Sequence, residues 1–183
     1  MTMTRGAGAM TIQVDRQPGE AGPALIIAPA LPLDAQLADV RVNGRPVRSS
    51  IAPAGDVQFV EVVVEQPAPR TTATFRYTGG SDVYVHTAAP LGGARSEGLR
   101  ILRSRADAGA LRVLVEGRGG HSYDVFLRTA RAVASVNGAQ LQPSIAGRDP
   151  VLRVTVDGAA EEYSKRDIVV TFAPGRASAR TGR

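Results

Sequence analysis

The chain has 183 residues, which is enough for one large β-sandwich or two small domains. Hydrophobic residues make up 43% of it but aromatic residues only 4%, so its core must consist mainly of aliphatic side chains. Its formal net charge is +5, and the absence of cysteine excludes disulfides, zinc–thiolate sites and thiol nucleophiles.

Neither a targeting segment nor a charged binding surface stands out in the sequence. Residues 1–10 contain no apolar run of the length that a signal peptide needs, and no stretch approaches the roughly 20 apolar residues of a membrane span. We therefore expect a cytoplasmic protein without a membrane partner. Much of the excess charge lies in a tail with Arg176, Arg180 and Arg183 and no acidic residue. Because the rest is nearly balanced, a nucleic-acid partner is not expected.

Short alternating strands separated by Gly, Pro and Asn turns recur along the whole chain, and no segment has a convincing helical period. The first candidate strand, 10–15, lies in an otherwise flexible N-terminal segment. The strands expected after it are 24–28, 37–42, 57–65, 70–78, 83–87, 99–105, 110–117, 122–129, 132–136, 151–156 and 167–172. This pattern predicts an all-β protein with antiparallel sheets in a β-sandwich, or in two abutting sandwich halves.

Two of these strands are more apolar than an alternating pattern requires. Residues 24–28 read as a buried strand. In 57–65, Phe59 and Glu61 follow the alternation, whereas the run Val62-Val63-Val64 predicts burial on both faces near the end of the strand.

Two turns and one break organise the chain. Asn43-Gly44 and Asn137-Gly138 each follow a valine and supply the positive φ of tight hairpins, which hints at two related halves. The Gly-Gly-Ser-Asp break at 79–82 divides them. The expected organisation is a flexible segment 1–23, a first half 24–80, a second half 81–174 and a disordered basic tail 175–183.

The first half, with about 55 residues, would bury too little surface to be stable alone. We therefore expect it to pack on the second half or on a partner, and we expect an exposed edge strand or an apolar patch.

No catalytic constellation accompanies this architecture. The sequence His121-Ser122-Tyr123-Asp124 contains the residue types of a hydrolase triad, but neighbours on a strand point to opposite faces. His86 shares a strand face with Asp82 and Tyr84, yet two histidines exclude a His-rich metal site. Glycoside hydrolysis needs two carboxyls that face each other across a cleft, which the spacing of the glutamate pairs 61/65 and 161/162 does not show. Glu61 and Glu65 are expected to face solvent along one strand.

The expectation is therefore a chain without catalytic residues, metal ligands or a cofactor. Four residues stay as candidates for ligand binding: Tyr84, His86, His121 and Tyr163. The two tyrosines among them could stack on sugars, whereas Tyr77 and Tyr123 are in phase with apolar neighbours and are expected in the core.

Three pieces of sequence resemble a known type of protein. They are 27–32 with 42–47, then 98–102 with 111–123, and then 136–139, 162–163 and 168–172. Together, over about residues 24–173, they are similar to the C-terminal all-β region of large bacterial glycoside-hydrolase-like proteins. The resemblance implies β modules that pack beside a helical-barrel domain, which carries the catalytic acid and base. That domain is missing from this sequence, so no catalytic motif transfers.

These observations predict a non-catalytic β-sandwich accessory or structural module. It would pack on a partner polypeptide, either a larger carbohydrate-active enzyme or a second copy of itself. One alternative is a carbohydrate-binding module with a polysaccharide ligand, and another is a stand-alone enzyme of unknown type, which would need ionisable groups converging in a pocket.

Overall fold

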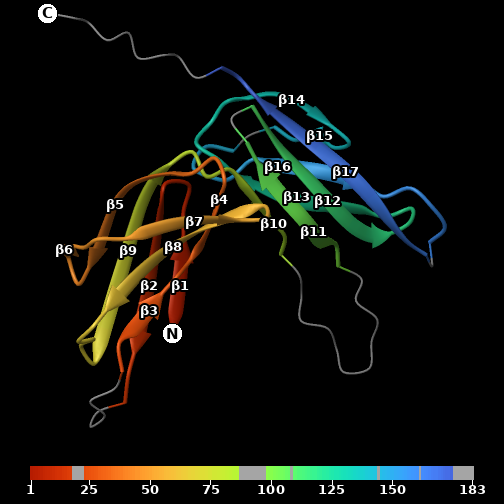
Figure 1. Cartoon of the computed structure of the whole chain (residues 1–183). Coiled ribbons are helices and arrows are strands. Elements are labelled where there is room, and N and C mark those ends of the chain that lie inside the picture. The colour runs from red at the N-terminus through yellow and green to blue at the C-terminus, as the bar shows by residue number, and fades with distance from the viewer. Residues whose placement is uncertain (18–22, 87–97, 108, 144, 161, 175–183) are drawn as a thin grey trace, which may run out of the picture.

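The computed structural model describes residues 1–17, 23–86, 98–107, 109–143, 145–160 and 162–174. Within these residues the chain is all-β, and every strand pair is antiparallel, which confirms the predicted fold class. Figure 1 shows the strands in two groups that lie side by side, red to yellow for the N-terminal group and green to blue for the C-terminal group.

The first group is a two-sheet sandwich. One sheet has the order β1-β2-β9-β5-β6, and in the other β8 pairs with β3 and β4 along one edge and with β7 along the opposite edge. The strands are β1 (Thr2–Arg5), β2 (Ala9–Asp15), β3 (Leu25–Ile27), β4 (Ala30–Pro32), β5 (Gln36–Val42), β6 (Arg45–Pro46), β7 (Ser50–Ala54), β8 (Val57–Val64) and β9 (Arg70–Thr78).

The second group is also a two-sheet sandwich, with strand orders β11-β12-β17-β14 and β10-β13-β16-β15. Its strands are β10 (Asp82–Tyr84), β11 (Arg100–Ala106), β12 (Ala110–Arg118), β13 (Ser122–Arg128), β14 (Val133–Asn137), β15 (Gln140–Leu141), β16 (Val151–Thr155) and β17 (Tyr163–Phe172).

The two sandwiches share a connectivity. In each, an initial hairpin (β1–β2 or β11–β12) borders the last strand of the sandwich (β9 or β17), and the strand before the Asn-Gly turn (β5 or β14) borders that last strand on its other side. The opposite sheet centres on the next-to-last strand, β8 or β16. β10 is an additional edge strand of the second sandwich.

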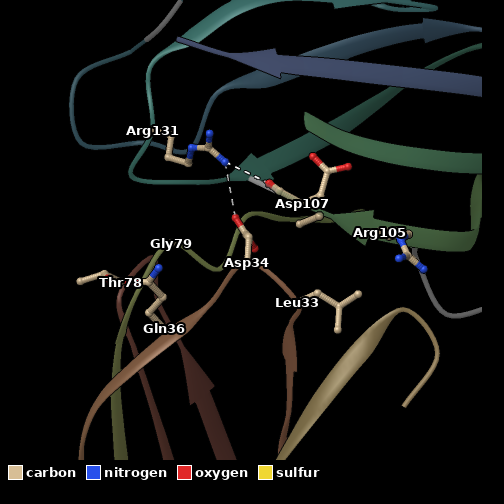
Figure 2. Close-up of a pocket in the computed structure, with 9 residues that line it drawn as sticks. Leu33, Asp34, Gln36, Thr78, Gly79, Arg105, Asp107 and Arg131 are labelled. Atoms are coloured by element: carbon tan, nitrogen blue, oxygen red, sulfur yellow. Dashed lines mark hydrogen bonds and ion pairs between the residues drawn. The ribbon is translucent and has the colours of Figure 1, made fainter. Parts of the chain in front are cut away.

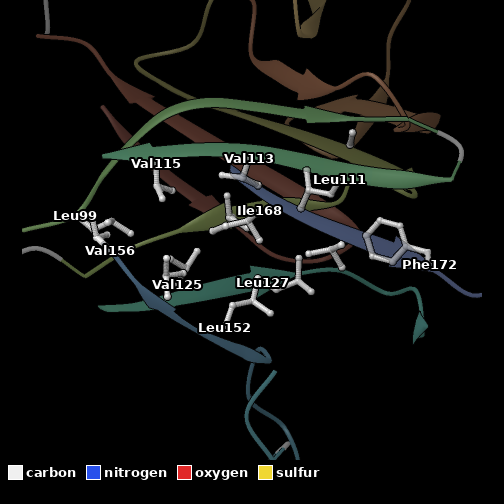
Figure 3. Close-up of a cluster of buried hydrophobic side chains, with 14 residues drawn as sticks. Leu99, Leu111, Val113, Val115, Val125, Leu127, Leu152, Val156, Ile168 and Phe172 are labelled. Carbon is white, nitrogen blue, oxygen red and sulfur yellow. The ribbon is translucent and has the colours of Figure 1, made fainter. Parts of the chain in front are cut away.

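Each sandwich has its own core. The alternation of β9 buries Ala73, Phe75 and Tyr77 against Met10 and aliphatic residues of the facing sheet. In the second sandwich the buried side chains are almost all Val, Leu and Ile, which project from both sheets into the space between them (Figure 3). Among the described residues, the two clusters of buried side chains have no member in common.

The N-terminal segment differs from the sequence-based expectation of flexibility. β1 and β2 both form, and β2 lies against β9 with Met10 opposite Phe75. Met10 and Ile12 are buried because the alternation of β2 points them at the first core. The first sandwich therefore begins before residue 24. Residues 18–22 of the expected flexible segment and the basic tail 175–183 lie outside the described residues.

Candidate functional site

Two of the four sequence candidates come together at the edge of the second sandwich. Tyr84 lies opposite Phe126 in the β10–β13 register, and their rings stack with centroids 5.2 Å apart. His86 follows β10 and meets both rings edge-on, at 5.4 Å from Tyr84 and 4.7 Å from Phe126. With Ile145 and Pro150 these rings line a groove of about 570 Å³.

The Tyr84 ring is already engaged by protein groups. Its hydroxyl donates a hydrogen bond to Asp149 Oδ2 at 3.1 Å, and the Arg128 guanidinium lies 4.5 Å from its ring centroid. Burial, followed by this hydrogen bond, raises the pKa of the Tyr84 phenol, which keeps it neutral. A sugar ring would therefore compete with Phe126 and Arg128 for the faces of this tyrosine.

The other two candidates lie elsewhere. His121 precedes β13, so about five residues of extended strand, roughly 16 Å, separate it from Phe126. Tyr163 begins β17 opposite Arg118, and Arg100 lies over its ring at 5.5 Å. The structure therefore does not assemble the four candidates into one site.

Tyr77 and Tyr123 were expected in the core. Tyr77 is buried there, and Tyr123 packs against the second core while its hydroxyl accepts a hydrogen bond from the Arg118 backbone N–H.

A second cavity, of about 640 Å³, lies between the two sandwiches (Figure 2). Asp34 lines this cavity, and its side chain is only 4% exposed. Its carboxylate accepts a hydrogen bond from the Ser81 backbone N–H and lies 3.8 Å from Arg131 Nη1. Burial raises the pKa of the Asp34 carboxyl, and the hydrogen bond from Ser81 opposes that shift.

Further ion pairs cross the same junction. Asp56, in the β7–β8 turn, accepts two hydrogen bonds from Arg103 at 2.5 and 2.9 Å and one from Arg105 at 3.2 Å. These arginines hold the pKa of the Asp56 carboxyl below its usual range. In another pair the first sandwich supplies the cation, because its Arg5 lies 3.0 Å from Asp82 of the second sandwich. These polar contacts hold the two sandwiches together, so we interpret the junction as structural.

The third feature is an apolar sheet surface, which we call the outer β8 face. On β8, Phe59 and Val63 point away from the core and are 40% and 47% exposed. Their cross-strand neighbours continue the surface, with the 61% exposed Ile26 opposite Val63 and Ala30 and Ala52 on either side of Phe59. We define the face by Ile26, Ala30, Ala52, Phe59, Glu61 and Val63.

The sheet on the other side of the same sandwich is different. On its outer surface, Thr74 of β9 lies between Thr11 of β2 and Arg41 of β5. Two residues further along β9, Arg76 lies opposite Asp39 of β5. Asp39 and Arg41 form an ion pair at 2.6 Å. One outer face of the first sandwich is thus polar, as water requires, and the other is apolar.

The carboxylate of the outer β8 face, Glu61, and the neighbouring carboxylate of Glu65 are unpaired. Among the described residues, Glu61 and the following Glu65 have no hydrogen bond or ion pair, although aspartates such as Asp15, Asp56 and Asp124 each contact an arginine. Ser50 lies opposite Glu61 on β7. The edge next to this face carries Pro53, which lacks the N–H that an added strand needs.

The sequence predicted an exposed edge strand or an apolar patch but not where it lies, although a signal for its place existed. The predictions of a buried strand at 24–28 and of burial on both faces at 62–64 are wrong in part, because Ile26 and Val63 are exposed. Ile27 and Val62, next to them, are buried as expected. Consecutive apolar residues, in place of the alternation of apolar and polar residues, thus indicate where this apolar face lies.

In the described part of the chain, no group of three or more His, Cys, Asp or Glu side chains gathers as a metal site would require, and no helix has the length and apolarity of a membrane span. A scan of protein-family models and searches of curated proteins and of solved structures found no match to this chain. The resemblance to glycoside-hydrolase-like proteins therefore stays a prediction from the sequence.

Proposed function

We propose that this protein is a non-catalytic β-sandwich accessory module that packs on a partner polypeptide through the outer β8 face. The observation that carries the proposal is the exposure of Ile26, Phe59 and Val63 on one sheet face. A contiguous apolar patch on a folded domain is typical of a protein–protein contact. Covering the exposed part of each of these side chains contributes on the order of 1 kcal/mol, before the costs of association.

The sequence pattern supports the same proposal. Residues 24–28 and 62–64 have the composition of strands buried on both faces, and the described residues cover only one face of each. A partner on the outer β8 face would supply the missing cover. The resemblance described above makes a carbohydrate-active enzyme the first class of partner to test.

The experiment compares three baits in extracts of the native host, read by quantitative mass spectrometry. They are the wild-type chain, Val63→Ser, and Leu141→Ser, which removes a similarly exposed (43%) apolar side chain from the second sandwich. We expect a stoichiometric partner on the wild-type and Leu141→Ser baits and its loss from Val63→Ser. Equal recovery on all three folded baits would contradict the proposal.

A carbohydrate-binding module is the second candidate, favoured by the groove that Tyr84, His86 and Phe126 line. It predicts that neutral oligosaccharides perturb the NMR signals of these residues and that Tyr84→Ala abolishes the effect. No shift across a panel of soluble glycans would contradict it.

A further inference from the structure

We infer that the partner of the outer β8 face presents an apolar surface with an arginine or lysine placed against Glu61. This inference rests on the proposed function and adds the chemistry of the partner. The inference follows from the position of the Glu61 carboxylate within the apolar surface.

Glu61 lies in the middle of the face rather than at its rim. Alternate residues of a strand point to one side and are about 7 Å apart, so Glu61 stands between Phe59 and Val63 along β8. On one side of Glu61 lies the cross-strand row of Ala30, Phe59 and Ala52. On the other side of Glu61 lies the cross-strand pair of Ile26 and Val63. A surface that covers both apolar rows also covers Glu61.

Covering this carboxylate has a consequence for the partner. A carboxylate taken out of water without a compensating group costs several kcal/mol. Among the described residues, no cation of this chain pairs with Glu61, although the chain is rich in arginine and most of its described aspartates are paired. The compensating cation must therefore come from the partner.

The same charge argues against other occupants. A second copy docked face to face about a two-fold axis would bring two Glu61 carboxylates into the same interface without a cation between them. A nucleic acid would be repelled by Glu61 and Glu65. An added strand at the neighbouring edge would meet Pro53. A basic, apolar protein surface fits all of these features.

The test uses the full chain and the purified partner that the three-bait comparison identifies. Calorimetric titrations at increasing NaCl compare the wild type with Glu61→Gln, Glu61→Lys and Val63→Ser. Asp167→Lys is the matched control, because Asp167 is an exposed carboxylate on the second sandwich without an ion pair among the described residues. Sedimentation velocity of the chain alone tests for self-association.

We expect Glu61→Lys to weaken binding about tenfold or more, Glu61→Gln to weaken it less and to flatten the salt dependence, and Asp167→Lys to bind like the wild type. Replacing the contacting cation of the partner by glutamate should restore binding to Glu61→Lys. If Val63→Ser weakens binding and Glu61→Lys does not, the charge assignment is overturned while the docking face stands. If Val63→Ser has no effect, both fail. A dimer of the chain alone that Val63→Ser dissolves would overturn the cationic partner in favour of a second copy.

Discussion

The two sandwiches of this chain share a connectivity but differ in what their outer faces present. On the second sandwich, Ser122 and Thr155 meet across the strands at 2.9 Å and Asp124 pairs with Arg153 at 2.6 Å, so the face of β13 and β16 is polar beside the groove that Phe126 lines. On the first sandwich, the equivalent central strand β8 presents Phe59 and Val63. Inward positions specify the shared fold, whereas outward positions can differ without changing it.

A cavity in one core is expected to have the largest effect on stability. Leu127→Ala in the second sandwich is expected to cost about 2–5 kcal/mol, because Leu127 is fully buried among aliphatic side chains. Since the two cores have no described residue in common, hydrogen exchange should accelerate in β10–β17 more than in β1–β9. Urea unfolding measures the loss of stability, and hydrogen-exchange mass spectrometry measures the acceleration in each sandwich. Equal acceleration in the two sandwiches would show that they unfold as one unit.

The two Asn-Gly turns provide a matched pair of glycine substitutions. Gly44 and Gly138 both have φ of 80°, which costs an L-residue about 1–2 kcal/mol. A Cβ at Gly44 meets nothing within 4 Å, whereas a Cβ at Gly138 runs into the backbone carbonyl oxygen of Asp167. We therefore expect Gly138→Ala to lower the free energy of unfolding clearly more than Gly44→Ala. Equal losses in denaturant titrations would mean that the β14–β15 turn moves away from β17.

The junction gives a pH-dependent comparison between two carboxylates of the first sandwich. The folded-state pKa of Asp34 is raised by burial, so its contribution to stability declines as the pH rises from its unfolded pKa through the folded one. The pKa of Asp56 is lowered by Arg103, so its contribution is present above its unfolded pKa and declines as the pH falls through the folded one.

Asp34→Asn and Asp56→Asn should therefore change the pH profile of stability in opposite directions. Relative to the wild type, Asp34→Asn gains stability as the pH rises from the unfolded pKa of Asp34 through its folded pKa. Asp56→Asn gains stability relative to the wild type as the pH falls from the unfolded pKa of Asp56 through its folded pKa. Thermal unfolding from pH 3 to pH 7 checks this, with Asp167→Asn as the control. Parallel profiles for the two variants would contradict the assigned environments.

The smallest effect on stability is expected at the outer β8 face. Val63→Ser should change the free energy of unfolding by less than about 1 kcal/mol, because the side chain is already 47% exposed. The same substitution is expected to abolish partner binding. A large loss of stability would instead make Val63 a core residue, and the apolar face would then be part of the fold.

The sequence predicted much of the fold because strand alternation is local. β9 has its predicted bounds, and the strand before each Asn-Gly turn forms as expected. β7 was missed because all five of its residues are exposed and one is proline, and β6 and β15 have only two residues each. Such strands are stabilised by their neighbours rather than by a pattern of their own.

The candidate site was less predictable, because it depends on which faces the fold covers. Tyr84 and His86 were expected on one strand, but β10 ends at Tyr84 and His86 follows it. The two rings still meet, and Phe126, Arg128 and Asp149 join them through tertiary contacts. The contact of Asp56 with Arg103 joins residues 47 positions apart, which no local pattern indicates. The apolar runs at 24–28 and 62–64 were visible, but that their second face is uncovered became evident only in the structure.

Photo-crosslinking from the outer β8 face shows whether a protein partner covers this face in the cell. A photoreactive amino acid replaces Ala52, beside Phe59, in one protein and Arg76, on the polar face of the same sandwich, in another. Both are irradiated in host cells, and the adducts are identified by mass spectrometry. We expect one dominant protein partner from position 52, joined through a segment that contains arginine or lysine, and none from position 76. Equal crosslinking from both positions, or none from either, would contradict it.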